Sequence, residues 1–146
     1  MLERELDAAR QARPRDSARY VGVQRQQAEG AGRVDDPQQG SGPISAITAA
    51  ELAAGPLLAS TPVEAAKRQS RLQEVESLME PIPFDGRAVR SYGLVVAAVI
   101  SEGRKSRGRF ADLLIAATAH ANGLDLYSRN ADGFAGLGNL VRVVGV

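Results

Sequence analysis

The sequence predicts an α/β domain in which helices flank a central parallel sheet. From residue 43 onward, helix-forming runs alternate with short apolar segments, and this alternation is typical of parallel sheets joined by helical crossovers. The last short segment, 140–146, is rich in valine, which favours strands. A chain of 146 residues is long enough for one domain with a sizeable core and too short for two. We therefore expect a single domain over 43–146.

The first 42 residues differ from the rest in composition. They are rich in arginine, glutamine, glycine and acidic residues, and large apolar residues are few. Pro14 interrupts the one short run that could form an amphipathic helix, and the stretch 30–42 is typical of a linker. We expect residues 1–42 to be a poorly ordered segment that contributes no core strand to the domain.

Capping residues and apolar spacing predict the elements of the domain. A short strand at 44–47 is expected to lead into an alanine-rich helix that begins at Thr48, which would place Glu51 in its first turn. Thr61 as N-cap with Pro62 at the first helical position is a strong helix start. Further elements are expected as helices at 62–79, 85–102 and 109–121, strands at 124–127 and 140–146, and an edge strand or linker at 80–84.

The composition limits the kinds of site that the chain can build. There is no cysteine and one histidine, so thiolate zinc sites and His-rich clusters are excluded and carboxylates are the plausible metal ligands. The net charge of +1 does not mark a general polyanion binder. The cluster of Arg104, Lys105, Arg107 and Arg109 is either a solvated loop or a phosphate contact, for which Arg107 or Arg109 is our candidate.

Nothing in the sequence indicates a membrane protein. No run approaches the roughly 18 apolar residues of a membrane span, and the N-terminus lacks the apolar core of a secretory signal. We expect a cytoplasmic protein with no membrane partner.

Four polar residues are candidates for chemistry. Glu51 lies on one helix, Asp112 begins another, and Asn130 and Asp132 follow a strand. In a parallel α/β sheet these places can meet at one edge, and clustered carboxylates favour a bound cation such as Mg²⁺ or Mn²⁺, which could activate water for attack on a phosphodiester. The residues alone leave an alternative open, because carboxylates stabilise helix N-termini and Asn and Asp are ordinary turn residues.

Four segments taken together resemble a PIN domain of the VapC toxin type. They are ITAAEL at 47–52, the run from Phe84-Asp85 to Tyr92-Gly93, GRKSRGRFADLLIAATA at 103–119 and NGLDLYSRNADGFAGL at 122–137. The resemblance covers about 43–146 and implies a three-layer fold with a central parallel sheet flanked by helices. It also implies a Mg²⁺- or Mn²⁺-dependent endoribonuclease toxin that cleaves RNA, is neutralised by a cognate antitoxin, and forms a homodimer or a toxin–antitoxin hetero-oligomer.

The resemblance assigns roles to individual residues. The helical glutamate of the family falls on Glu51, and the aspartate before its LIAATA helix falls on Asp112. The fourth position falls on Asn130, with Asp132 nearby as a carboxylate that could serve, while Ser128 stands where the family usually has threonine. The resemblance therefore implies Glu51, Asp112, Asn130 and Asp132 as the catalytic set and Glu51, Asp112 and Asp132 as the metal ligands.

The sequence departs from the family pattern at its start. Members open with an apolar strand that ends in a metal-binding aspartate, and no such strand is evident here. Asp16 lies at about the right distance before Glu51, but residues 10–15 are too polar for a central parallel strand, and Asp35 or Asp36 is a weaker candidate. A frameshift or misassigned start upstream of about residue 43, or a degenerate relative, would explain the departure.

Three functions therefore stand as hypotheses. The first is an active metal-dependent ribonuclease. The second is a catalytically impaired PIN-domain remnant that acts only as a binding protein, because cleavage was lost with the first aspartate. The third, an α/β domain of unrelated function, is disfavoured by the ordered set of motifs.

Overall fold

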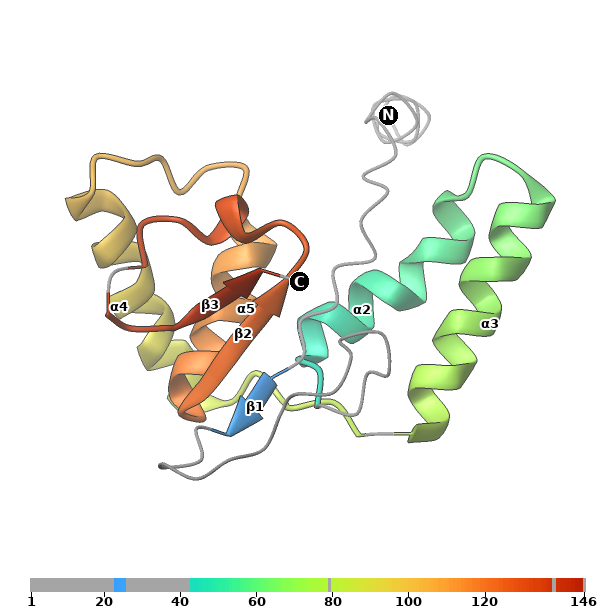
Figure 1. Cartoon of the computed structure of the whole chain (residues 1–146), viewed down its shortest axis with the longest axis horizontal. Helices are drawn as coiled ribbons and strands as arrows, with labels where there is room; N and C mark the ends of the chain where they lie inside the picture. Colours follow the sequence, from blue (N-terminus) through green and yellow to red (C-terminus); the bar gives the residue numbers. More distant parts are fainter. Residues whose placement is uncertain (1–22, 26–42, 79, 138, 146) are drawn as a thin grey trace.

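A computed structural model of the chain describes residues 23–25, 43–78, 80–137 and 139–145 (Figure 1). The alternation expected from the sequence is only partly present, because the helices from α2 to α5 follow one another with a single isolated bridge, Ser45–Ile82, among them, and the strands β2 and β3 come after α5. In chain order the elements are β1 (Val23–Arg25), α2 (Ala46–Ala54), the 3₁₀ helix η1 (Gly55–Leu58), α3 (Pro62–Leu78), α4 (Gly86–Ser101), α5 (Phe110–Ala121), β2 (Leu124–Ser128), the 3₁₀ helix η2 (Ala131–Phe134) and β3 (Val143–Gly145).

The sheet contains the parallel pairing that the sequence predicts. Strand β2 lies in the middle of three strands and pairs in parallel with β3, with Leu126 opposite Val143 and Ser128 opposite Gly145. A second parallel contact is the isolated bridge between Ser45 and Ile82. The α/β fold class with a parallel sheet and flanking helices is confirmed.

One strand was not predicted. Strand β1 pairs antiparallel with β2, and Val23 lies opposite Leu126 while Arg25 lies opposite Leu124. The sequence predicts no core strand in residues 1–42, and β1 is a three-residue strand at the edge of the sheet. Backbone hydrogen bonds to a strand edge do not require an apolar sequence, which is why composition missed this pairing. The order predicted for 1–22 and 26–42 lies outside the described residues.

Helix α2 begins earlier than predicted. Its N-cap is Ser45, whose Oγ accepts a hydrogen bond from the Thr48 backbone N–H at 3.0 Å and lies 2.9 Å from Thr48 Oγ1. The strand expected at 44–47 is consequently reduced to the single bridge at Ser45. Both serine and threonine are good caps, and the structure uses the first of them. Glu51 therefore lies in the middle of α2 and not in its first turn.

The other helix starts are where their caps predict. The Glu64 N–H donates to Thr61 Oγ1 at 3.1 Å at the start of α3, and Asp85 Oδ1 accepts from the Arg87 and Ala88 N–H groups, both at 3.1 Å, at the start of α4. Asn122 is the C-cap of α5, and the following Gly123 has a φ of 63°, a conformation that glycine adopts without strain.

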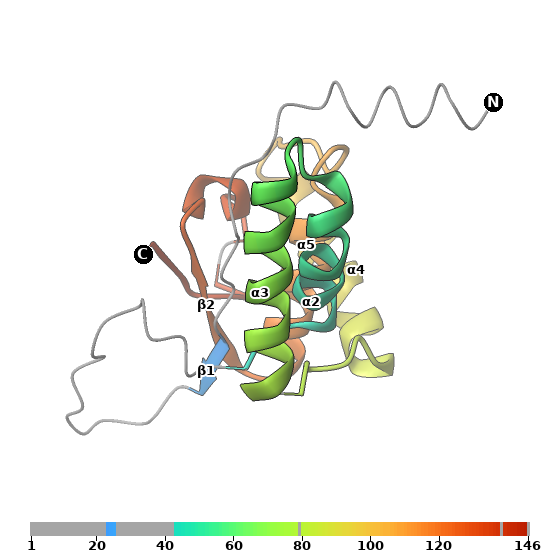
Figure 2. The ribbon, with the colours of Figure 1, turned by 90° about the vertical axis from the view of Figure 1, so that its right-hand side faces the viewer.

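The core lies between the sheet and the last two long helices. Helix α5 packs on one face of β2, and α4 packs against α5 (Figures 1 and 2). Helix α5 is buried on most sides, as its apolar sequence predicts. Helices α2 and α3 form a hairpin that extends away from the sheet on the right of Figure 1. No helix in the described part of the chain is long and apolar enough to cross a membrane.

Candidate active site

Asp112 is the buried carboxylate of the candidate site. It lies in the first turn of α5, and only 5 % of its surface is exposed. The first-turn position places the carboxylate near the unpaired N–H groups of the helix, which favours its negative charge. Burial of a carboxylate costs free energy unless neighbouring polar groups or a metal ion compensate for it. The residues around Asp112 therefore decide whether this site can bind a cation.

The turn after β2 brings a second polar side chain to Asp112. A β-carbon added at Gly133 would lie 2.9 Å from Asn130 Nδ2 and 3.4 Å from Asp112 Oδ2. The side chains of Asn130 and Asp112 therefore border the same small space beside the Gly133 backbone. This contact confirms that the start of α5 and the segment after β2 meet, as expected for the crevice of a parallel α/β sheet.

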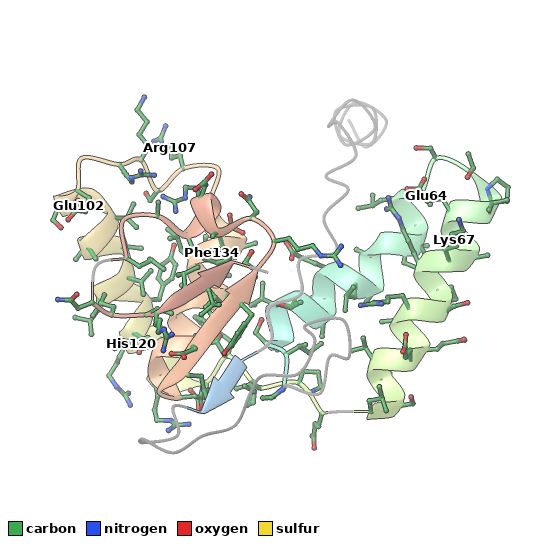
Figure 3. All side chains as sticks on the ribbon, in the orientation of Figure 1. Glu64, Lys67, Glu102, Arg107, His120 and Phe134 are labelled. Atoms are coloured by element: carbon green, nitrogen blue, oxygen red, sulfur yellow. The ribbon has the colours of Figure 1, made fainter. Side chains whose placement is uncertain are left out.

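Local hydrogen bonds shape that turn. Ser128 is buried at the end of β2, and its Oγ accepts a hydrogen bond from the Asn130 backbone N–H at 3.0 Å. Asp132 follows in the first turn of η2 with its side chain exposed, and the buried ring of Phe134 anchors the other end of the turn in the core (Figure 3). The turn thus presents one amide next to Asp112 and one carboxylate to solvent.

Arg109 connects the two segments. Its Nε donates to the Gly133 carbonyl at 3.0 Å and its Nη2 to the Ala135 carbonyl at 3.0 Å, and Nη2 also contacts the Gly133 oxygen. The guanidinium that the sequence suggested for a substrate phosphate is therefore engaged with the backbone of the η2 turn. Arg107 lies exposed on the preceding loop (Figure 3).

Glu51 and Asp132 are the more exposed members of the predicted ligand set. Glu51 lies on an exposed part of α2, and Asp132 is also exposed. Among the residues that the structure describes, no group of three or more histidine, aspartate or glutamate side chains could hold a metal ion. The joint role of Glu51, Asp112 and Asp132 as metal ligands therefore stays a prediction.

The donor chemistry of these residues fits a hard divalent cation in part. Asp112 brings a carboxylate oxygen and Asn130 its amide nitrogen to one place, and of these two the carboxylate oxygen is the kind of ligand that Mg²⁺ and Mn²⁺ prefer. Strand β1, which pairs with β2, has the sequence Val-Gln-Arg and so contains no aspartate or glutamate. Asp16, Asp35 and Asp36, the candidates for a first acidic ligand, lie outside the described residues.

Gly133 was not among the candidate residues, yet a β-carbon at this position would meet the side chains of both Asp112 and Asn130. Arg109 was a candidate for a solvated loop or a phosphate contact, and its hydrogen bonds to carbonyls 24 and 26 residues away were not predicted. The Asp-Gly pair after a polar strand end is the one sequence signal that pointed to a tight backbone approach at this place.

Most of the chain matches one known protein family. The model of the PIN domain family matches residues 31–139, which include the start of α5, the turn after β2 and Glu51 on α2. This chain belongs to the PIN domain family. The third hypothesis, an α/β domain of unrelated function, is thereby excluded.

Two solved structures resemble this PIN domain. One is a member of the VapBC family of toxin–antitoxin systems, VapBC-5 from Mycobacterium tuberculosis, with 32% identity over 71% of this chain and 81% of that chain and a TM-score of 0.64. The other is VapBC2 from Rickettsia felis bound to a DNA fragment from their promoter, with 26% identity over 71% of this chain and 74% of that chain and a TM-score of 0.59. No curated protein matches the sequence.

The predicted resemblance is confirmed by these matches. This PIN domain is of the VapC type, and it belongs to a family of toxin–antitoxin nucleases. Membership of this nuclease family indicates a class of reaction for the site at Asp112, which the geometry of the site alone does not indicate.

Proposed function

We propose that this PIN domain is a metal-dependent endoribonuclease toxin that acts in the cytoplasm, cleaves RNA phosphodiester bonds and is neutralised by a cognate antitoxin. The observation that carries this proposal is the buried carboxylate of Asp112 beside the Asn130 amide, inside the segment that matches the PIN family. A buried carboxylate at a helix start, next to a polar turn at a strand end, is suited to bind a cation together with a substrate phosphate.

Each residue has a role in this proposal. Asp112, Asp132 and Glu51 would hold Mg²⁺ or Mn²⁺, with Asp112 as the central ligand because it is the buried member. The bound cation supplies positive charge that activates water and stabilises the phosphodiester during attack. The Asn130 amide would orient an oxygen at the same place, and the exposed Arg107 would contact the RNA backbone.

An antitoxin partner is supported by the two similar structures, which both belong to VapBC systems. The end of the α2–α3 hairpin carries three exposed apolar side chains, Leu57, Leu58 and Val63, and Leu57 is 87 % exposed. Apolar side chains gathered at one place are typical of a surface that a protein partner covers. We propose that this PIN domain assembles as a homodimer or with its antitoxin as a hetero-oligomer.

The alternative is a catalytically impaired PIN domain that only binds its partners. Strand β1 favours it, because this strand occupies the edge of β2 in an antiparallel direction and brings no carboxylate. Such a protein would bind RNA or antitoxin without cleaving RNA. A filter-binding assay that detects RNA binding in the absence of any cleavage would support this alternative.

The cleavage experiment compares the wild-type chain with Asp112→Asn. Both proteins are incubated with a pool of single-stranded RNA and Mg²⁺ or Mn²⁺, and the products are separated by size. The matched control is Asp125→Asn, which makes the same chemical change at another buried aspartate. Asp125 lies near the start of β2 and forms a salt bridge with Arg142. We expect cleavage by the wild type and by Asp125→Asn and none by Asp112→Asn. Equal cleavage by all three proteins would refute the proposed site.

A further inference from the structure

Arg109 occupies a position that links the two halves of the candidate site. It is the N-cap residue of α5, three residues before Asp112, and its backbone carbonyl accepts the Leu113 N–H at 2.9 Å. The backbone of Arg109 is thus part of the first turn of α5, and its guanidinium reaches the η2 turn. One side chain therefore joins the helix that carries Asp112 to the turn that carries Asn130 and Asp132.

The hydrogen bonds of Arg109 end on two alternate residues of that turn. Nε and Nη2 donate to the carbonyl of Gly133, and Nη2 also donates to the carbonyl of Ala135. A planar guanidinium that contacts two carbonyls in this way fixes both the distance and the orientation of the peptide groups. A lysine at the same position would offer only a single charged nitrogen on a flexible stem.

Gly133 connects the Arg109 hydrogen bonds to the candidate site at Asp112 and Asn130. Its carbonyl accepts from Arg109, while a β-carbon at this position would lie 3.4 Å from Asp112 Oδ2 and 2.9 Å from Asn130 Nδ2. A shift of the Gly133 peptide would therefore move the space that these two side chains border. Arg104, on the loop before α5, also approaches this segment closely. A β-carbon at Gly136, whose φ is 90°, would lie 2.9 Å from Arg104 Cδ.

We propose that Arg109 is a positioning residue, whose guanidinium holds the η2 turn against the start of α5 so that Asn130 stays beside Asp112. Its effect on metal binding and cleavage rests on the proposed function, but its effect on the turn does not. The proposal assigns Arg109 to the turn and not to the RNA phosphate, because its Nε and Nη2 donate to backbone carbonyls.

The test uses the full chain and the variants Arg109→Gln and Arg109→Lys. Hydrogen exchange measures the protection of backbone amides over 131–136, electron paramagnetic resonance measures Mn²⁺ affinity, and RNA cleavage gives kcat and KM. The control is Arg90→Gln, which removes an exposed arginine from α4. Thermal unfolding of every variant shows whether the fold is retained.

For Arg109→Gln we expect faster exchange in the turn, an Mn²⁺ affinity lower by about 10- to 100-fold, and a lower kcat with an unchanged KM, because outer residues that orient ligands have effects of this size. Arg109→Lys should behave similarly, since it keeps the charge and loses the two-carbonyl contact. Arg90→Gln should match the wild type in all three measurements. If Arg109→Gln fails to fold, Arg109→Lys decides the question.

Wild-type exchange rates in the turn of Arg109→Lys would overturn the proposal. A raised KM with unchanged kcat and unchanged exchange would also overturn it, since that result describes a phosphate contact. If the wild-type chain neither binds Mn²⁺ nor cleaves RNA, the proposed function fails, and the exchange rates alone then decide whether Arg109 positions the turn.

Discussion

Asp112 and Asn130 border one small space from two different elements. Asp112 belongs to the first turn of α5, Asn130 to the turn after β2, and their side-chain atoms lie 3.4 Å and 2.9 Å from the position that a β-carbon on Gly133 would occupy. Because glycine has no β-carbon, the turn can approach the helix this closely. The arrangement of the candidate site therefore depends on the absence of one side chain.

The substitution Gly133→Ala should displace the Asn130 amide, since a separation of 2.9 Å is too short for a carbon and an amide nitrogen. We expect Mn²⁺ affinity and RNA cleavage to fall by about tenfold or more, as for other residues that orient a metal site. Calorimetric titration and cleavage assays measure both. The control is Gly93→Ala on α4, where an added β-carbon would meet nothing within 4 Å. This substitution should stabilise the protein by about 0.5–1 kcal/mol. Wild-type activity in Gly133→Ala would contradict the arrangement.

The substitution Ser128→Ala should loosen the turn after β2. Its buried hydroxyl accepts the Asn130 N–H at 3.0 Å, and loss of such a hydrogen bond costs about 1 kcal/mol. Urea unfolding measures the free energy, and the control is Ser77→Ala, whose hydroxyl lies at an exposed position of α3 and donates to the Glu74 carbonyl. Equal stability of the two variants would show that the buried hydroxyl does not support the turn.

Two isoleucines test the assignment of the core. Ile115 on α5 is fully buried, and Ile100 on α4 is 61 % exposed. Ile115→Ala should reduce the free energy of unfolding by about 2–5 kcal/mol, because it leaves a cavity between helix and sheet. Ile100→Ala should change it by less than about 0.5 kcal/mol. Chemical denaturation measures both, and similar losses in the two variants would place the core elsewhere.

Asp85 should make the stability of the fold depend on acid. The Ala88 N–H donates to its carboxylate and lowers the pKa of Asp85, and the charge of Arg87 lowers this pKa further, against an opposing effect of desolvation. A carboxyl group with a lower pKa in the folded state stabilises the fold above its unfolded pKa of about 3.9, and this contribution is lost as the pH falls through the lower folded value.

The variant Asp85→Asn keeps an oxygen acceptor for the N-cap and removes the titrating group. We expect its stability to fall less steeply than that of the wild type between about pH 5 and pH 2, because the Asp85 contribution is missing at every pH. Unfolding curves measured across this range provide the comparison. Parallel pH profiles for the two proteins would show that Asp85 does not contribute.

The sequence was sufficient to locate most elements and the central residue of the site. Thr61 with Pro62 and Asp85 mark helix starts by local hydrogen bonds, which is why these starts were predicted correctly. Asp112 and Asn130 were expected at one edge of the sheet from the order of helices and strands, and the structure brings them together. These inferences depend on neighbours along the chain or on the topology of parallel sheets.

The features that were missed depend on contacts between distant residues. Strand β1 has no apolar pattern and is held by backbone pairing to β2, and Arg109 reaches carbonyls more than 20 residues away. The start of α2 was misplaced for a different reason, since Ser45 and Thr48 are both competent caps, and in the structure the Ser45 hydroxyl accepts the Thr48 backbone N–H. Local propensity cannot rank such alternatives.

The most direct test of a metal-dependent site at Asp112 is a calorimetric titration of the full chain with Mn²⁺, carried out in parallel on the wild type, Asp112→Asn and Asp125→Asn. We expect saturable binding to the wild type and to Asp125→Asn, and its loss in Asp112→Asn, because Asp112 is the buried carboxylate on which the proposed site is built. The absence of binding to the wild type, or equal binding to all three proteins, would contradict a metal site at Asp112.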